Sequence, residues 1–244
     1  PLGPMTPSAL PPLRVKLTST TDGRFDAGGT TARFSTLSVA FGAGRGIGEA
    51  YARALAAAGA AVVIADLDVV GAQRVADAIG EEGGTAAAVE VDVSDEGSAA
   101  AMAAFADERF GGIDHLVNNA AIFGGMKIDS LLRIDWEYLE RFMAVNLMGA
   151  LVCTRACYRS MRKRGGGSIV NQSSTAAYLY SNYYGLAKAG VNSLTQQLAH
   201  ELGGMNIRIN AIAPGPIDTE AAGSVVPAEY IEQMVASFPL KRQG

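Results

Sequence analysis

Short apolar runs alternate with alanine-rich runs of helical spacing between residues 37 and 212, and this alternation constrains the fold more than any other feature. Such alternation is typical of βαβ units, in which parallel strands form a sheet with helices on both faces. The sequence therefore predicts an α/β fold with a single doubly wound, Rossmann-like sheet of about six or seven strands. The expected strands are 37–41, 61–65, 85–91, 113–118, 168–172 and 206–212, and the expected helical regions are 46–58, 69–79, 97–110, 135–164 and 183–202.

Composition excludes several classes of protein. Hydrophobic residues make up 49% of the 244 residues and charged residues 18%, so the chain can bury a large core. With 20 Lys and Arg against 24 Asp and Glu, and no basic run interleaved with aromatics, we expect no nucleic-acid partner. The longest apolar stretch, residues 54–65, is shorter than the roughly 18 residues that a membrane span needs. Since no secretory signal is recognisable, we expect a cytoplasmic protein without a membrane partner.

The composition changes near Phe34. Five of the nine prolines lie in the first twelve residues, and residues 1–33 show no sustained helical or strand period. We expect these residues to form a flexible or non-native tail. Further along, Cys153 and Cys157 lie one helical turn apart, where a disulfide has difficult geometry, and no Cys or His cluster surrounds them. We expect reduced cysteines in the core or at an interface, and no metal site.

The first chemical motif closes the first expected strand and opens the first expected helix. It reads Gly42-Ala43-Gly44-Arg45-Gly46-Ile47-Gly48, which has the spacing G-x-x-x-G-x-G and not the strict G-x-G-x-x-G. Glycines let the backbone approach a pyrophosphate, which then lies at a helix N-terminus where N–H groups and the helix dipole favour negative charge. Alone, the motif is equally compatible with a simple turn.

Asp66 ends the second expected strand, eighteen residues after Gly48. A carboxylate there accepts hydrogen bonds from the ribose hydroxyls of NAD and repels the 2′-phosphate of NADP, although an Asp can also simply cap a turn. Arg45 favours the other cofactor, because a guanidinium beside the loop can pair with a 2′-phosphate, or it is a solvated side chain. We give Asp66 more weight, so the sequence predicts NAD, with NADP as the less favoured cofactor.

A tyrosine and a lysine stand one helical turn apart in Tyr184-Gly185-Leu186-Ala187-Lys188. This spacing puts the phenol and the ammonium on one helix face, where the ammonium lowers the phenol pKa toward the range that a general acid/base needs. As an isolated pair it would more often be a surface feature. Ser174 and Asn118-Asn119-Ala120-Ala121 follow the ends of expected strands, where ligands bind in such sheets, and Asn146 lies on the long helix. The set favours a catalytic site.

In this order and spacing, the motifs from about Gly42 to Gly244 resemble those of the short-chain dehydrogenase/reductase family. Asp92-Val93 and the segment Asn210-Ala211-Ile212-Ala213-Pro214-Gly215 with Thr219 complete the resemblance. It implies that residues 34–244 form a Rossmann-type NAD-binding catalytic domain. It also implies an NAD(P)-dependent oxidoreductase that acts on CH–OH groups.

The resemblance implies a role for each matching residue. Tyr184 would be the general acid/base, and Lys188 would lower its pKa while holding the nicotinamide ribose. Ser174 would hydrogen-bond the substrate oxygen, and Asn146 would hold a water that relays protons to Lys188. The cofactor site would include the loop residues Gly42, Arg45, Gly46, Ile47 and Gly48, together with Asp66, Tyr184 and Lys188. Asp92 and Val93 would flank the adenine, and Asn119 and Ala120 would lie along the ribose. Pro214, Gly215, Ile217 and Thr219 would cover the nicotinamide.

The chain departs from the family pattern in several places, among them Ala121, where a glycine is commoner. Phe41 stands where the family usually has Thr, so we expect a short or impaired first strand. Ser174 is three residues closer to Tyr184 than in many members. Members usually continue beyond Gly244 through another helix and a final strand, so we expect a truncated domain with an exposed sheet edge. The family commonly forms tetramers, and we expect a homo-oligomer, at most a dimer, through the helices at 135–164 and 183–202.

The predicted function is hydride transfer between NAD(H) and a mainly apolar secondary alcohol or ketone, with Tyr184 as general acid/base. Phe123, Tyr178 and Leu179 are expected to line an apolar pocket under a lid at 217–238. Two alternatives remain open. One is an NADPH-dependent 3-oxoacyl reductase, which Arg45 favours. The other is a dinucleotide-binding protein whose truncated frame impairs catalysis.

Overall fold

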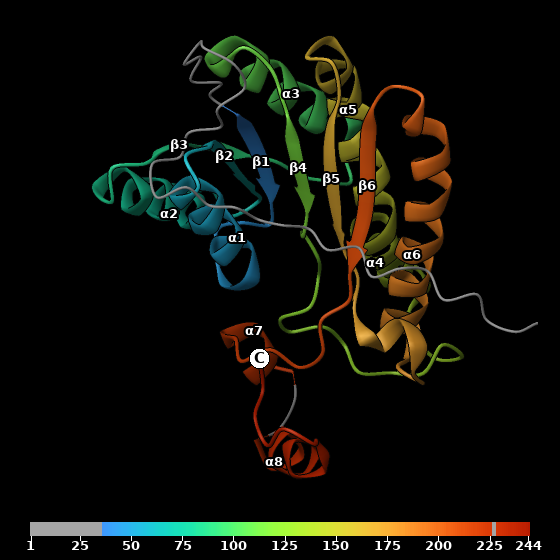
Figure 1. Cartoon of the computed structure of the whole chain (residues 1–244). Coiled ribbons are helices and arrows are strands. Elements are labelled where there is room, and N and C mark those ends of the chain that lie inside the picture. The colour runs from blue at the N-terminus through green and yellow to red at the C-terminus, as the bar shows by residue number, and fades with distance from the viewer. Residues whose placement is uncertain (1–35, 226–227) are drawn as a thin grey trace, which may run out of the picture. The chain divides into compact units, whose positions relative to one another are not determined.

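Six parallel strands form one sheet in the order β3-β2-β1-β4-β5-β6 (Figure 1). The computed structural model describes residues 36–225 and 228–244, and the tail expected over residues 1–33 lies outside them. The strands are β1 Leu37–Phe41, β2 Ala61–Asp66, β3 Thr85–Glu90, β4 His115–Asn118, β5 Gly167–Gln172 and β6 Ile207–Ile212. The predicted doubly wound, Rossmann-like α/β fold is confirmed, and each strand begins and ends within two residues of its expected bounds.

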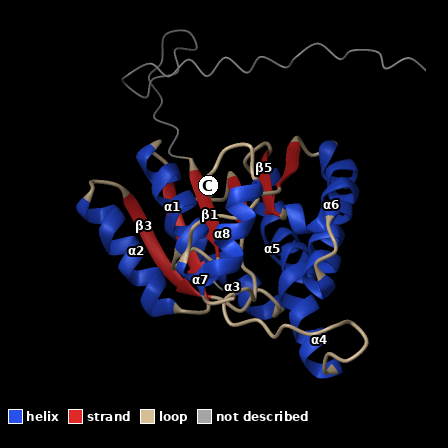
Figure 2. Cartoon of the chain, turned by 90° about the horizontal axis from the view of Figure 1, so that it is seen from below, coloured by secondary structure: helices blue, strands red, loops and turns tan. Residues whose placement is uncertain are grey.

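Helices α1 to α6 flank the sheet on its two faces, whereas α7 and α8 lie beyond the carboxyl ends of the strands (Figures 1 and 2). Their bounds are α1 Gly46–Ala57, α2 Val69–Glu81, α3 Glu96–Phe110, α4 Trp136–Met143, a π-helical turn Ala144–Met148, α5 Gly149–Lys163, a 3₁₀ turn Thr175–Tyr178, α6 Asn182–Gly203, α7 Glu220–Gly223 and α8 Ala228–Ser237. The helical region expected over 135–164 is therefore α4 and α5 joined by one wider turn.

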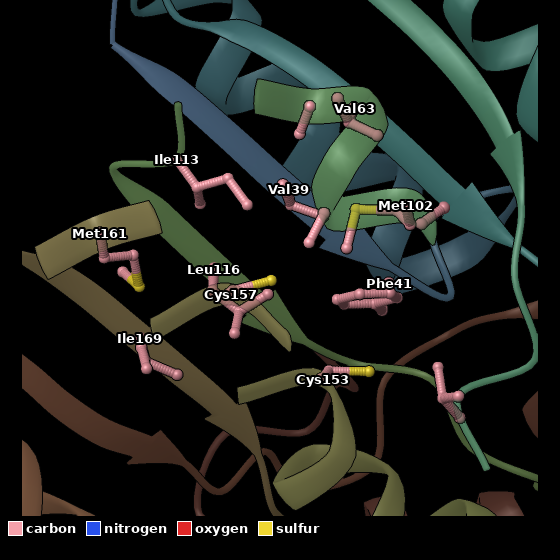
Figure 3. Close-up of a cluster of buried hydrophobic side chains, with 14 of the residues drawn as sticks. Val39, Phe41, Val63, Met102, Ile113, Leu116, Cys153, Cys157, Met161 and Ile169 are labelled. Carbon is pink, nitrogen blue, oxygen red and sulfur yellow. The ribbon is translucent and has the colours of Figure 1, made fainter. Parts of the chain in front are cut away.

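Strand alternation divides the core between the two faces. In β1, Val39 and Phe41 pack toward α3 and α5, whereas Ala40 packs toward α1 and α2. Figure 3 shows the larger cluster, in which Phe41 lies among side chains such as Met102 and Cys153. Phe41 is fully buried, and β1 pairs with β2 along its whole length, so the expectation of an impaired first strand is wrong. Both cysteines are free and buried, as predicted.

The chain reverses direction across the sheet between β1 and β4. It runs outward from β1 through β2 to β3, and then crosses back to pair β4 with the other edge of β1. In doubly wound sheets, ligands bind outside the carboxyl ends of the strands at such a reversal. The loops after β1 and β4 therefore border the expected ligand site.

Candidate active site

The loop after β1 brings the backbone close to the loop after β4. Gly42 has φ +66°, and a Cβ on it would lie 2.6 Å from the Cα of Ala120. A Cβ on Gly48, in the first turn of α1, would overlap the main-chain oxygen of Gly42. The Asn119 amide donates to that same oxygen at 2.8 Å. These two positions admit only glycine, because backbone from another segment occupies the space of a side chain.

The N-terminus of α1 differs from those of α2, α3 and α4. Asp68, Asp95 and Asp135 each cap the helix that follows with a carboxylate. Among the residues that the structure describes, no side chain caps α1, which begins after Arg45. The first N–H groups of α1, which include those of Gly46 and Ile47, are thus available to an anion, and the helix dipole favours negative charge there.

Asp66 holds the glycine loop by its carboxylate. Its Oδ2 accepts from the main-chain N–H of Gly44 at 2.8 Å, and its Oδ1 accepts from that of Asp68 at 3.0 Å. The carboxylate therefore has a fixed orientation. It lines the same cavity as the exposed Arg45, so the two residues whose charges argue for different cofactors lie at one site.

A cavity of about 490 Å³ lies at the carboxyl ends of the strands. It brings together many of the predicted cofactor residues, namely Gly42, Arg45, Asp66, Asp92, Val93, Asn119 and Ala120. Its remaining walls include Leu67, Ile122, Phe123 and Arg141. A second, water-sized cavity of about 10 Å³ has Asn146 and Lys188 in its wall. Ala120 lines both cavities, so the two adjoin.

Asn146 lies in the π-helical turn between α4 and α5. Its Oδ1 accepts from the Ile122 main-chain N–H at 2.7 Å, and its Nδ2 donates to the Ile122 oxygen at 2.9 Å. The amide thus acts as a clamp on the loop after β4. π-Helical turns occur often at functional sites, where the extra residue re-aims a side chain. The water-sized cavity beside Asn146 and Lys188 has room for the predicted relay water.

Lys188 and Tyr184 share one face of α6, as their spacing predicts. The Lys188 Nζ is buried, donates to the Gln172 main-chain oxygen at 2.8 Å, and lies 5.7 Å from the centre of the Tyr184 ring. The Phe123 ring, which lines the larger cavity, lies 5.3 Å from the Tyr184 ring. Tyr184 therefore packs against a residue that lines the cavity.

The pKa values differ from the expectation for an activated phenol. Burial raises the pKa of Tyr184, and a hydrogen bond with the Ser174 hydroxyl acts in the opposite direction. Burial also lowers the pKa of Lys188 to about 8. Desolvation dominates at both groups, and Lys188 is not among the groups that lower the Tyr184 pKa, in contrast to the prediction.

A compact turn accommodates the short spacing between Ser174 and Tyr184. Ser174 accepts from the Ala176 N–H and begins the 3₁₀ turn. The Ser181 hydroxyl donates to the Ala176 oxygen at 2.6 Å. Asn182 then takes a left-handed conformation with φ 48°, and its Oδ1 accepts from the Tyr184 N–H at 3.0 Å. The shorter connection therefore still leaves the Ser174 hydroxyl near enough to Tyr184 to act on its pKa.

The segment after β6 supplies the last predicted residues. The Pro214 oxygen accepts from the Thr175 N–H at 2.9 Å, which joins this segment to the turn after Ser174. Thr219 caps α7, and a Cβ on Gly46 would lie 3.8 Å from its methyl group. The segment therefore reaches the glycine loop. Gly215 and Ile217 lie between these two anchors and do not line the larger cavity.

The described residues fit a dinucleotide. The close approach at Gly42 and Gly48, the uncapped α1, and a fixed carboxylate at Asp66 are what a pyrophosphate and a ribose diol require. Two contributors were missed from the sequence. Arg141 pairs with Asp92 across the cavity rim, and the Gln172 carbonyl anchors Lys188. Neither carries a sequence signal, because both act through tertiary contacts.

Comparisons with known proteins agree with this geometry. A family model described as enoyl-(acyl carrier protein) reductase matches residues 42–244. An uncharacterized oxidoreductase of Mycobacterium tuberculosis is 64% identical over 86% of this chain and 85% of its own length. The cis-4-hydroxycyclohexanecarboxylate dehydrogenase of Sinomonas cyclohexanicum is 39% identical over 84% of this chain and 82% of its own length.

A solved structure is similar as well. It is a 7α-hydroxysteroid dehydrogenase complexed with NADH and 7-oxo glycochenodeoxycholic acid, with a TM-score of 0.81 and 34% identity over 86% of this chain and 82% of its own. The chain belongs to the short-chain dehydrogenase/reductase family and is an oxidoreductase of that family. The resemblance in the sequence motifs is thereby confirmed.

Proposed function

We propose that this chain transfers a hydride between NAD(H) and a mainly apolar secondary alcohol or ketone, with Tyr184 as the general acid/base. The observation that carries the proposal is the placement of Tyr184: the Ser174 hydroxyl acts to lower its pKa, and its ring lies 5.3 Å from that of Phe123, which lines a cavity together with Asp66 and the glycine loop. When bound, NAD supplies the group that accepts or returns the hydride.

The chain's own side chains position the substrate and move one proton. The Ser174 hydroxyl hydrogen-bonds the substrate oxygen, and the Tyr184 Oη takes the hydroxyl proton during oxidation or returns it during reduction. The Lys188 ammonium uses one donor on Gln172 and keeps two for the nicotinamide ribose and for charge near the phenol. Asn146 holds the relay water beside Lys188.

An apolar substrate class is supported by the residues around the phenol. Phe123 faces Tyr184, and Tyr178 and Leu179 follow Ser174 with largely exposed side chains. The relatives named for a cyclohexane carboxylate and for a 7α-hydroxysteroid support the same class. Exposed apolar side chains beside one polar centre favour such molecules.

NAD is favoured over NADP by the charges of the cavity. Asp66, Asp68 and Asp92 line it together with Arg45 and Arg141, so carboxylates outnumber guanidiniums. A 2′-phosphate would therefore meet net negative charge. Arg45 supports the NADPH-dependent 3-oxoacyl reductase as a second candidate, because it is exposed on the same rim.

Titration with NADH and NADPH tests the cofactor assignment through nicotinamide fluorescence and the thermal midpoint. We expect micromolar NADH binding that raises the midpoint, and weaker NADPH binding. Turnover of a panel of secondary alcohols and ketones then tests the chemistry with Tyr184→Phe and its neighbour Tyr183→Phe. The Tyr183 hydroxyl donates to the Lys127 oxygen, so the control removes a phenol of the same helix turn.

Tyr184→Phe should bind NADH and lose turnover by about 10²-fold or more, whereas Tyr183→Phe should retain turnover. Unchanged oxidation in Tyr184→Phe would refute the mechanism. Tighter NADPH than NADH binding would favour the reductase alternative. Tight NADH binding without turnover of any substrate would leave the dinucleotide-binding protein as the better description.

We further infer a homodimer through the helices at 135–164 and 183–202, in a cytoplasmic enzyme whose catalytic domain spans 34–244. Exposed Trp136, Met148 and Leu186 on these helices support the interface. No helix among the described residues has the length and apolar character of a membrane span. Light scattering on the purified protein tests the dimer, and a monomer at micromolar concentration would refute it.

A further inference from the structure

Arg141 bridges two walls of the larger cavity. It lies in the last turn of α4, and its Nη2 is 2.9 Å from Oδ2 of Asp92, in the segment after β3. Its Nη1 donates to the hydroxyl of Ser94 in the same segment. Arg141 and Asp92 both line the cavity, so this ion pair forms part of its rim.

The Asp92 carboxylate is held at both oxygens. Oδ1 accepts from the Ser94 N–H at 2.9 Å and from the Ser94 hydroxyl at 2.7 Å, and Oδ2 accepts from Arg141. The Asp92 N–H donates to the Ser98 hydroxyl at 3.1 Å. Burial acts to raise the pKa of Asp92, but the bonds from Ser94 and Arg141 outweigh it and the pKa lies below its ordinary value. The side chain and the backbone of Asp92 are therefore held in place by the protein itself.

One stretch of helix supplies two residues that fix segments lining the cavity. Arg141 holds the segment after β3, and Asn146, five residues later, holds Ile122 in the loop after β4. Arg141 belongs to the last turn of α4, and Asn146 belongs to the π-helical turn that joins α4 to α5. The distance between these two walls is thus set by residues of a third element.

We propose that Arg141 is a positioning residue for the adenosine half of the dinucleotide, acting through Asp92. The inference rests on the proposed function, in which Asp92 flanks the adenine. Without the guanidinium, the Asp92 segment would be less ordered in the free protein. Ordering it when the ligand binds would cost conformational entropy and weaken the affinity. Arg141 is predicted to affect the binding of the adenosine half and to leave the reacting atoms untouched.

The experiment compares Arg141→Ala with Arg155→Ala. Arg155 lies on α5 and pairs with Glu96 at 2.9 Å, with side chains 62% and 68% exposed, so the control removes an ion pair that does not line the cavity. NADH affinity is measured by fluorescence, and ADP-ribose, which lacks the nicotinamide, is measured by displacement of NADH. Unfolding midpoints of the free proteins check that each variant folds.

Arg141→Ala should weaken the binding of NADH and of ADP-ribose by the same factor, about 3- to 10-fold. The effect is modest because the Arg141–Asp92 ion pair is partly exposed to solvent. Arg155→Ala should change neither affinity. Arg141→Lys should recover part of the lost affinity, since lysine keeps the positive charge but cannot donate to Asp92 and Ser94 through two nitrogens. Equal affinity of the wild type and Arg141→Ala for NADH would overturn the proposal.

A double-mutant cycle with Asp92→Ala tests whether Arg141 acts through Asp92. In that background Arg141→Ala should have no further effect on the affinity for NADH. If the full loss persists, Arg141 contacts the ligand directly and the proposal is wrong. If the wild-type chain binds neither NADH nor ADP-ribose, the proposed function fails together with this inference, whereas binding that Arg141→Ala leaves unchanged refutes the inference alone.

Discussion

Lys188 and Tyr51 hold Gln172 from two sides. The Lys188 ammonium donates to the main-chain oxygen of Gln172, and the Tyr51 hydroxyl donates to its side-chain Oε1, each at 2.8 Å. Gln172 is the last residue of β5, directly before the Ser173-Ser174 pair. The lysine is therefore tied to the strand that delivers the predicted substrate-binding serine.

Burial of Lys188 predicts a pH dependence of stability. Its pKa falls from 10.5 to about 8 on folding, so folding disfavours the charged form. Below pH 8 the native state carries the full penalty, and between about pH 8 and 10.5 the unfolded state binds more protons, so stability rises with pH. The penalty is on the order of 3 kcal/mol.

Urea unfolding of the wild type and Lys188→Met from pH 7 to 10.5 measures this effect. The stability of the wild type relative to Lys188→Met should increase with pH, because other groups that titrate in both proteins cancel in the difference. A difference that stays constant over this range would mean that the lysine is not desolvated.

Asp66 predicts the direction of a cofactor switch. Asp66→Asn removes the charge but keeps an oxygen that can accept from the Gly44 N–H. The ratio of NADH to NADPH affinity should fall by about 10-fold or more, because the repulsion of a 2′-phosphate is lost together with the ribose contact. Fluorescence titration measures both constants, and Arg45→Ala should move the ratio the opposite way. An unchanged ratio in Asp66→Asn would place the ribose elsewhere.

Two glycine substitutions should have opposite effects. Gly48→Ala puts a methyl group onto the Gly42 oxygen, so NADH binding should be lost and the midpoint lowered. A Cβ on Gly80, in α2, meets no atom of the described residues within 4 Å, so Gly80→Ala should stabilise the fold by about 0.5–1 kcal/mol, because alanine favours a helix. Calorimetry and NADH titration separate the two cases. NADH binding by Gly48→Ala at wild-type affinity would contradict the assigned loop.

Asn182 should tolerate glycine better than alanine. Its φ of 48° costs an alanine roughly 1–2 kcal/mol and a glycine nothing, although both lose the acceptor for the Tyr184 N–H. Asn182→Ala should therefore be about 1 kcal/mol less stable than Asn182→Gly in urea unfolding. Equal stabilities would show that the left-handed turn is not retained.

Sequence periodicity predicted the sheet and its helices, because apolar alternation and helical spacing are local properties. It could not predict that α4 and α5 meet through a π-helical turn, in which the Asn146 amide makes a tertiary contact with Ile122. The family pattern misjudged Phe41. Its departure from the usual Thr suggested an impaired strand, but the tertiary core between α3 and α5 accommodates the benzyl group.

Motif spacing gave the candidate site in outline. The cavity gathers Asp66, Asp92, Asn119 and the glycine loop, which lie far apart in the sequence. The pKa values of Tyr184 and Lys188 could not be inferred from spacing, because they depend on how much solvent the fold removes. Arg141 was missed for a similar reason, since an arginine in the last turn of a helix is ordinarily only a favourable charge.

The π-helical turn of residues 144–148 carries one residue more than a regular helix would need. A single-residue deletion there would let α4 and α5 run on as one uninterrupted α-helix, with better backbone hydrogen bonds. The same deletion would rotate Asn146 away from Ile122 by roughly a quarter-turn or more, or rotate Arg141 away from Asp92. A simpler helix is thus one deletion away, and it would break one of the two contacts, Arg141 with Asp92 or Asn146 with Ile122, by which this stretch fixes two segments that line the cavity.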